Sequence, residues 1–229
     1  MNSLNPMEVK LVSYSQPPAK MDGSRQMFHR TDDLIAYCAR VSNPQNQSNK
    51  ATNGRLLRYL IENQHWSPFE MCSVCLEVTT TRDIARQLLR HRSFSFQEFS
   101  QRYSDIADLN DSFVHRDARL QDLTNRQNSI DNDNAELDVW WHQQQTWVID
   151  NVKRIYREAL ERGIAKEQAR AILPEGNTVS KLYVNGTIRS WIHYIELRSA
   201  NGTQREHMEL ARSISKVIAE IFDGNRRYN

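Results

Sequence analysis

The chain has 229 residues, of which 39% are hydrophobic and 25% are charged, and its formal net charge is +2. This composition is ordinary for a globular protein, and the near-neutral charge argues against a general nucleic-acid binder, which needs a strongly basic face. No apolar run reaches the roughly 20 residues of a membrane span, and the first residues lack a signal-peptide pattern, so we expect a cytoplasmic protein. Because no low-complexity linker divides the chain, we predict a single domain over residues 1–229.

Predicted strands and helices alternate in the first third of the chain. The hydrophobic pattern predicts a strand over residues 7–14 and helices over residues 32–41 and 52–64, whose apolar residues recur every three or four positions. Pro68 prevents the second helix from continuing. Apolar residues then occupy every second position of residues 71–80, which predicts the clearest strand of the chain.

The three cysteines, Cys38, Cys72 and Cys75, are an odd number, which fits a reducing compartment. Cys72 and Cys75 have the spacing of a CxxC motif, but the sequence has no second pair. A strand over residues 71–80 would also direct their side chains to opposite faces. We therefore predict that they pack in the core and hold no metal.

Residues 87–103 combine three arginines, a histidine, a carboxylate and three serines with aromatic rings. They follow residues 80–83, which resemble a helix capping box, and the predicted helix carries Gln87, Arg90 and His91 on its polar face. An extended segment is expected after His91, because phenylalanines then nearly alternate with polar residues. Arginine grips two phosphate oxygens at once, so this mix suits a phosphorylated ligand that contains a ring. A basic helix end facing solvent is the simpler alternative.

The segment over residues 104–136 is polar, and we predict an irregular excursion with one short helix over residues 118–123. We attach no chemistry to residues 125–129, for which a solvated loop is the default. A long helix is predicted over residues 137–162, ending at Gly163. Its tryptophans suit the core or a subunit interface.

The last third predicts a short helix over residues 166–173, a strand over 178–185, a turn at Asn185 and Gly186, and helices over 187–199 and 204–222. This order of elements predicts the α+β class, with a mixed or antiparallel sheet flanked by long helices. The glycines lie too far apart for a dinucleotide fingerprint, so we expect no Rossmann fold. The motif serines lack a nucleophile elbow, and no HExxH motif supports catalytic zinc.

Residues 90–102 resemble the RHRxxSxxxxSxR motif of the flavin-dependent thymidylate synthases at every specified position. Those positions are Arg90, His91, Arg92, Ser95, Ser100 and Arg102. The residue before Glu98, often asparagine in the family, is the longer amide Gln97 here.

Four other segments resemble elements of the same family, and the resemblance runs from about Ala39 to Arg198. They are residues 39–42 (ARVS), 65–70 (HxxPFE), 169–174 (ARxxLP) and 187–198, the late flavin-and-nucleotide element. Thr187 stands where the family commonly has asparagine.

The resemblance implies reductive methylation of dUMP to dTMP. The carbon donor would be 5,10-methylenetetrahydrofolate, NADPH the reductant and FAD the hydride relay. It also implies a homotetramer whose active sites are shared between subunits. Arg198 matches the catalytic position, where a cation beside N3 of uracil favours the ionised ring and raises electron density at C5.

The resemblance also assigns binding residues by position. The positions that match dUMP-binding residues are Gln87, Leu88, Leu89, Arg90, Glu98, Phe99, Ser100, Gln101, Arg102, Arg170 and Arg198. Those that match FAD-binding residues are Ser67, Arg90, His91, Arg92, Glu98, Thr187, Arg189 and His193. Ser100 suits a phosphate-binding hydroxyl better than a nucleophile, because no base other than Glu98 is near.

Two other functions remain open from the residues alone. One is a single-strand or RNA-binding module that would stack bases on aromatic rings beside the arginines. Its residues would be Arg90, Arg92, Arg102, Phe94, Phe96 and Tyr103. The other is a helical oligomeriser that uses the tryptophan-rich long helix.

Overall fold

The computed structural model describes residues 7–16, 30–101 and 112–222. Its centre is a four-stranded antiparallel sheet in the order β1-β2-β6-β3. The strands are β1 (Glu8–Tyr14), β2 (Ser73–Thr81), β6 (Val179–Thr187) and β3 (Ser95–Glu98). The two long central strands pair along their whole length, from Ser73 opposite Thr187 to Thr81 opposite Val179.

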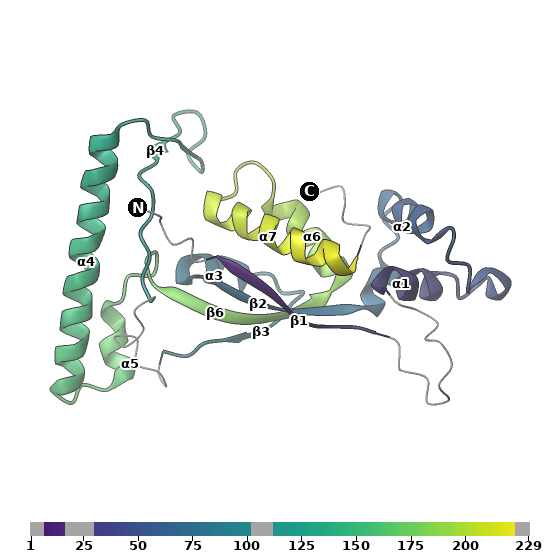
Figure 1. Cartoon of the computed structure of the whole chain (residues 1–229), viewed down its shortest axis with the longest axis horizontal. Helices are drawn as coiled ribbons and strands as arrows, with labels where there is room; N and C mark the ends of the chain where they lie inside the picture. The colour runs from purple at the N-terminus through teal and green to yellow at the C-terminus, as the bar shows by residue number, and fades with distance from the viewer. Residues whose placement is uncertain (1–6, 17–29, 102–111, 223–229) are drawn as a thin grey trace.

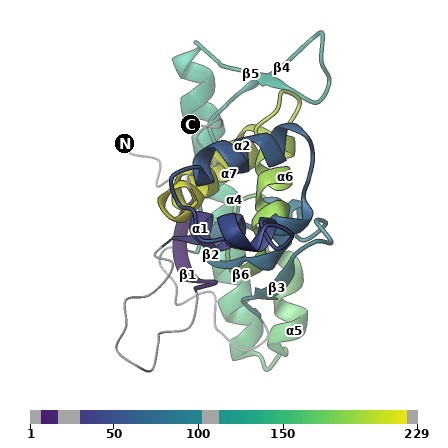
Figure 2. The same ribbon diagram turned by 90° about the vertical axis from the view of Figure 1, so that its right-hand side faces the viewer.

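Helices surround this sheet on one face and at both ends. Over one face lie α3 (Arg82–Leu88), α6 (Ile188–Arg198) and α7 (Arg205–Ile221), as Figure 1 shows. Figure 2, seen from the end where α1 (Thr31–Ala39) and α2 (Asn53–Glu62) lie, shows α6 and α7 above β1 and β2. The remaining elements are η1 (Pro44–Asn46), η2 (Ser67–Met71), β4 (Leu120–Gln121), β5 (Ser129–Ile130), α4 (Ala135–Glu161), α5 (Lys166–Ala169) and η3 (Arg170–Ile172). The predicted α+β class with a sheet flanked by long helices is therefore confirmed.

The hydrophobic core lies between the sheet and the helices that cover it. Val74, Leu76 and Val78 alternate along β2 and are fully buried, as the pattern predicted. Trp191 of α6 is also fully buried and donates from Nε1 to the carbonyl of Val74 over 3.1 Å. Cys72 belongs to this core, and burial, chiefly, raises the pKa of its thiol to about 12. It therefore packs as a small apolar group.

The predicted turn at Asn185 and Gly186 is wrong, because both residues lie inside β6 and pair with β2. A side chain at Gly186 would overlap the ring of Phe94, so the glycine makes room for a close ring-to-strand contact. The Asn-Gly pair predicted a turn, whereas the glycine lies inside a strand and allows the Phe94 ring to pack closely on it.

The helix predicted over residues 118–123 is also wrong. Leu120 and Gln121 form β4, which pairs with β5. The carboxylate of Asp122 accepts hydrogen bonds from the backbone amides of Thr124 and Asn125, at 2.8 and 3.0 Å. This Asx-type turn favours a hairpin over a helix.

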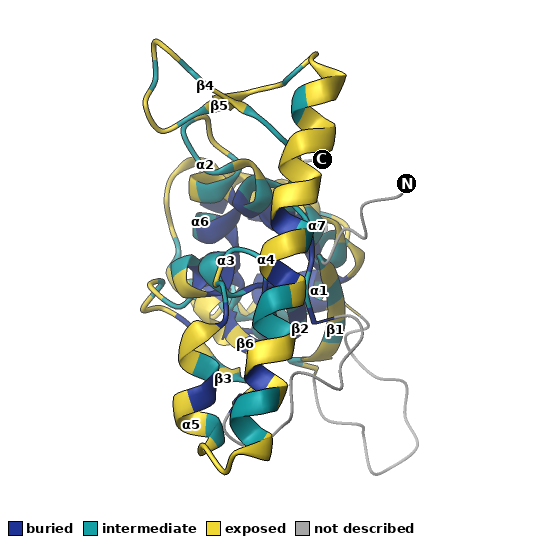
Figure 3. Ribbon diagram, turned by 90° about the vertical axis from the view of Figure 1, so that its left-hand side faces the viewer, coloured by how far each residue is buried: buried dark blue, intermediate teal, exposed yellow. Residues whose placement is uncertain are grey.

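The long helix α4 is capped by Asn134, whose side chain accepts from the amides of Glu136 and Leu137. Figure 3 shows that much of its outer surface is exposed. The exposed apolar residues of this surface are Val139, Trp140, Trp141, Trp147, Val148 and Ile155. The tryptophans thus do not pack in the core of the subunit. Among the described helices, none combines the length and apolar character needed to cross a membrane.

Candidate active site

Residues 87–103, which we call the motif segment, run from the end of α3 into β3, the edge strand of the sheet. Ile84, Ala85 and Leu88 direct the apolar side of α3 into the core. Thr81 is the N-cap residue, but its hydroxyl donates to the Asp83 carboxylate over 2.6 Å and makes no cap to the backbone. The predicted capping box is therefore not formed.

Arg198, at the end of α6, meets His91 directly. Its Nε donates to Nε2 of His91 over 2.9 Å, which joins two segments 107 residues apart. Because Nε2 accepts, the proton of the neutral ring lies on Nδ1. Burial first, and then the charge of Arg198, lower the pKa of His91 to about 4. His91 is therefore neutral near pH 7 and leaves the charge of Arg198 unopposed.

Gln87 belongs to the same group of side chains. The fully buried His207 of α7 contacts Oε1 of Gln87 and the hydroxyl of Tyr194, both at 3.1 Å. The rings of His91 and Tyr194 lie 5.0 Å apart, edge to face. We call Gln87, His91, Tyr194, Arg198 and His207 the His91 cluster. Three of its members, Gln87, His91 and Arg198, were predicted as site residues from the sequence.

A second group lies where η2 meets the first turns of α6. Arg189 forms an ion pair with Glu70, and the His193 ring lies 4.4 Å from that of Trp66. Ser67, which begins η2, is exposed beside them in the chain. The structure therefore brings Arg189 and His193 to the segment that carries Ser67.

The start of α6 is also tied to the motif segment. Thr187 is its N-cap residue, and the hydroxyl of Thr187 accepts from the amide of Ser190 over 3.2 Å. The Ser190 hydroxyl in turn donates to the carbonyl of Ser93 over 3.2 Å. Arg92, the neighbour of Ser93, and Arg90 are both exposed. Their guanidinium groups are therefore available to a ligand.

Glu98 marks a third group at the end of β3. It accepts from the hydroxyl of Ser180 over 2.9 Å and lies 3.9 Å from Arg82. Phe99 is partly exposed, whereas Gln101 is buried. Arg102 lies outside the described residues.

The other predicted substrate residues differ in what they could offer. Leu88 is fully buried in the core and Leu89 packs against it, so Leu88 could present only its backbone to a ligand. Ser100, two residues after β3, is partly buried. Arg170 begins η3, which packs against α4 and α5, and η2 packs against α1. Figure 1 shows α4 and α5 at the opposite end of the molecule from α1. Within the described residues, no hydrogen bond joins Arg170 to the His91 cluster.

The sequence analysis missed Arg116, Arg119 and Glu206. Arg116 holds Oε2 of Glu206 at 3.0 Å and Asp83 at 2.7 Å, and Arg119 pairs with Oε1 of Glu206. The sequence predicted only an irregular segment over residues 104–136, so these partly buried arginines were overlooked. His207 was also missed, although the sequence carried a signal for it. His207 falls on the apolar stripe of α7, and a buried imidazole needs hydrogen-bond partners.

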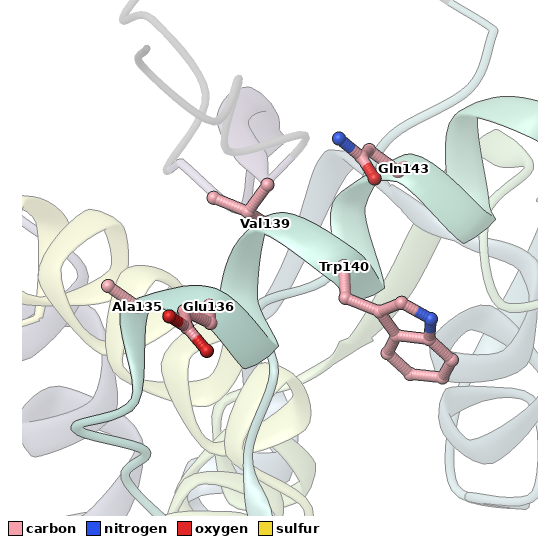
Figure 4. Close-up of a pocket in the computed structure, with 5 residues that line it drawn as sticks. All are labelled: Ala135, Glu136, Val139, Trp140 and Gln143. Atoms are coloured by element: carbon pink, nitrogen blue, oxygen red, sulfur yellow. The ribbon is translucent and has the colours of Figure 1, made fainter.

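Two cavities lie along α4. The larger, of about 580 Å³, is lined by side chains that include Asp83, Arg116, Arg119, Trp141 and Gln145. Figure 4 shows the smaller one, of about 350 Å³, formed by one side of the helix. Its residues are Ala135, Glu136, Val139, Trp140 and Gln143. The His91 cluster lines neither of these two cavities.

Of the three rings that the single-strand binding alternative would use, Phe94 and Phe96 are not open to a stacked base, and Tyr103 lies outside the described residues. Phe94 is buried and packs 4.4 Å from the ring of Trp191. Phe96 is partly buried against the same core. These contacts argue against the single-strand binding alternative, which needs exposed rings.

Comparisons with known proteins agree with the resemblance seen in the sequence. The profile of the family described as "Thymidylate synthase complementing protein" matches residues 25–222. The chain is 46% identical over 216 residues to a probable flavin-dependent thymidylate synthase of Paramecium bursaria Chlorella virus 1, covering 94% of this chain and 95% of the relative. Identity is also 46% over 216 residues to a flavin-dependent thymidylate synthase of Synechocystis sp., covering 94% and 96%.

A solved structure has the same fold. The UMP/dUMP methylase PolB from Streptomyces cacaoi, bound with 5-Br dUMP, superposes with a TM-score of 0.78 at 26% identity, covering 97% of this chain and 93% of that one. Since the family profile and the relatives span most of the chain, the chain belongs to the thymidylate synthase complementing protein family, as the motif over residues 90–102 predicted.

Proposed function

We propose that this chain is a flavin-dependent thymidylate synthase that methylates dUMP to dTMP. The carbon donor is 5,10-methylenetetrahydrofolate and the reductant is NADPH. The observation that carries the proposal is the 2.9 Å hydrogen bond from Arg198 to His91. This bond joins the motif over residues 90–102 to the late element over residues 187–198, and both would have to lie at the same uracil ring.

Arg198 is suited to activate that ring. A guanidinium has five N–H donors, and the bond to His91 uses only the one on Nε. The four donors on the Nη atoms remain for a nucleotide carbonyl and an ionised N3. A positive charge there stabilises negative charge on the ring and so increases the electron density at C5, the atom that is methylated.

The residues present fit FAD. Arg90 and Arg92 are exposed cations that suit a pyrophosphate, and the start of α6, with Thr187 and Arg189, adds helix-end amides and a further cation. Trp66 and His193 offer ring edges beside them. Bound FAD would carry a hydride from NADPH to the nucleotide. Ser67, His91 and Glu98 complete the proposed flavin residues.

The nucleotide would be held by the motif segment, by η3 and by Arg198 at the end of α6, with Leu88 offering only its backbone. The residues we propose are Gln87, Leu88, Leu89, Arg90, Glu98, Phe99, Ser100, Gln101, Arg102, Arg170 and Arg198. Arg170 begins η3, which packs against α4, whereas η2 packs against α1 at the other end of the sheet (Figure 1), and this separation suits a site completed by a second subunit.

A homotetramer with shared sites is therefore part of the proposal, as is a cytoplasmic location. The exposed tryptophans of α4 support the assembly, because a monomer rarely exposes such a large apolar strip. The strip would be covered by neighbouring subunits.

Product analysis tests the proposed function. The purified protein is incubated with dUMP, 5,10-methylenetetrahydrofolate and NADPH, with and without FAD, and nucleotides are separated by chromatography. We expect dTMP only when flavin is present, either added or retained from purification. A flavin-free preparation that forms dTMP at the same rate would contradict the assignment.

A further inference from the structure

A continuous line of side chains connects the first turn of α7 to the His91 cluster. Nε2 of Gln204 donates to Oε2 of Glu206 over 3.0 Å, and Nε2 of Gln87 donates to Oε1 of Gln204 over 2.7 Å. Oε1 of Gln87 meets Nδ1 of His207 at 3.1 Å, and Nε2 of His207 meets the hydroxyl of Tyr194 at 3.1 Å. Every link is between side chains.

The carboxylate at one end sets the direction of every link. An ionised carboxylate only accepts, so Gln204 must turn its NH₂ toward Glu206 and its carbonyl toward Gln87. Gln87 must then donate to that carbonyl, which turns its own oxygen toward His207. That oxygen requires a proton on Nδ1 of His207, and the hydroxyl of Tyr194 donates to Nε2.

Glu206 is held firmly in its ionised, accepting state. Burial raises the pKa of its carboxyl, but the charges of Arg116 and Arg119, with hydrogen bonds from its own amide and Gln204, outweigh burial and lower that pKa overall. The two arginines also fix its position, since each binds a different carboxylate oxygen.

His207 at the other end cannot reverse the direction by taking up a second proton near neutral pH. It is fully buried, and burial first, then Arg198 and His91, lower its pKa to about 3. The imidazole therefore keeps one donor and one acceptor.

The Gln87 amide retains one N–H and one oxygen lone pair for a ligand, and their places are fixed. A freely rotating glutamine can exchange its donor and acceptor by turning over. If the Gln87 amide turned over, its oxygen would face the side-chain oxygen of Gln204 and its NH₂ would face the N–H of His207, and both contacts are repulsive. The amide therefore presents one hydrogen-bonding pattern.

We propose that Gln204, Glu206 and His207 are positioning residues that fix the Gln87 amide and so make the nucleotide site select uracil over cytosine. The proposal rests on the proposed function, in which Gln87 contacts the base of dUMP. At position 4 uracil presents an acceptor and cytosine a donor, and this difference remains when N3 of uracil is ionised and accepts as N3 of cytosine does. An amide that cannot turn over can match only one of these patterns.

Two substitutions interrupt the line at different links. Gln204→Leu removes the connection but leaves the ion pairs of Glu206 intact. Glu206→Gln replaces the carboxylate with an amide that both donates and accepts, so the direction is no longer imposed. Glu209→Gln is the matched control, because Glu209 lies one turn further along α7 and pairs with Arg205 instead.

The experiment measures the dissociation constants of dUMP and dCMP by calorimetry on the FAD-loaded protein. We expect the preference for dUMP to fall about tenfold in both variants, the effect of one lost oriented hydrogen bond. Glu209→Gln should keep the wild-type preference. His207→Asn, whose NH₂ can replace the Nδ1 donor, should keep a preference within about twofold of wild type.

Melting temperature and flavin content show that each variant is folded. A wild-type protein that forms dTMP, with an unchanged dUMP preference in Gln204→Leu and Glu206→Gln, would overturn this inference and leave the proposed function standing. A wild-type protein that makes no dTMP and binds neither nucleotide would overturn both.

Discussion

Arg198 and His91 form a hydrogen-bonded pair in which only the arginine is charged near neutral pH. The motif over residues 90–102 predicted the histidine, and the late element predicted the arginine. Neither segment alone predicted that the two side chains touch, because a 2.9 Å contact between the residues that follow α3 and the end of α6 depends on how both helices pack on the sheet. The sequence therefore predicted which two residues belong to the site, but not that they contact each other.

Removing the Arg198 side chain tests its role. Arg198→Ala should lower kcat about 100- to 1,000-fold, because the charge that stabilises the developing anion is lost. Flavin content and melting temperature should change little, since the side chain lies at a helix end. Arg212→Ala, on an exposed position of α7, is the control. Full turnover in Arg198→Ala would refute the assignment.

Acid should destabilise the protein through His207, which is fully buried, and His91, which is partly buried. Unfolded histidine has a pKa of about 6.5, whereas in the folded protein the pKa of His207 is about 3 and that of His91 about 4. Below pH 6.5 the unfolded chain therefore binds protons that the folded chain does not. Stability is fully present above pH 6.5 and falls as the pH decreases toward these values.

Urea denaturation at several pH values measures this effect. Between about pH 7.5 and pH 5 the free energy of unfolding should fall less in His207→Asn than in wild type, because asparagine does not titrate. If the free energy of unfolding fell equally with pH in both proteins, His207 would not contribute to the acid sensitivity.

At the scale of elements, the sequence located most helices and strands to within a few residues. It failed where a local pattern had two meanings. Gly186 reads as a turn but lies in β6 under Phe94, and residues 120–121 read as helical but pair with β5. The segment predicted to be irregular also contains Arg116 and Arg119, whose partial burial depends on Glu206 of a distant helix.

Gly186→Ala tests the close contact between β6 and Phe94. The added methyl group would overlap the Phe94 ring, which is held against Trp191 and Tyr194, so the ring cannot move away freely. We expect a loss of roughly 1–3 kcal/mol in the free energy of unfolding, as for other overpacked cores.

The same substitution in a helix supplies the control. Gly54 lies in the first turn of α2, and the nearest atom to an added Cβ is Nη1 of Arg58, at 4.0 Å. Gly54→Ala should leave the protein as stable or up to about 1 kcal/mol more stable, because alanine favours the helix. Equal melting temperatures for Gly186→Ala and wild type would contradict the packing account.

At the scale of the whole molecule, the exposed side of α4 is the feature that a single chain leaves unexplained. Helical periodicity predicted the length of α4 but could not decide whether its tryptophans face the core or another subunit. The structure places Trp140 and Trp147 on the surface of the chain, 53% and 67% exposed. Burying them against other copies would also bring further residues to a shared site.

Trp147→Glu should therefore disrupt the assembly. A carboxylate in an apolar interface costs several kcal/mol unless it is paired, so the tetramer should dissociate to smaller species in light scattering. Tyr59→Glu makes the same kind of change at an exposed residue of α2, at the opposite end of the sheet (Figure 1), and should preserve the tetramer. An intact tetramer in Trp147→Glu would show that the subunit interface does not include this side of α4.

The central claim, that the protein methylates C5 of uracil with the help of flavin, is tested most directly by tritium release. The substrate is dUMP labelled at C5, incubated with 5,10-methylenetetrahydrofolate and NADPH, with and without FAD. We predict that tritium enters water only with flavin, and that Arg198→Ala releases it at least about 100-fold more slowly. A protein that binds FAD and dUMP yet releases no tritium would contradict the account.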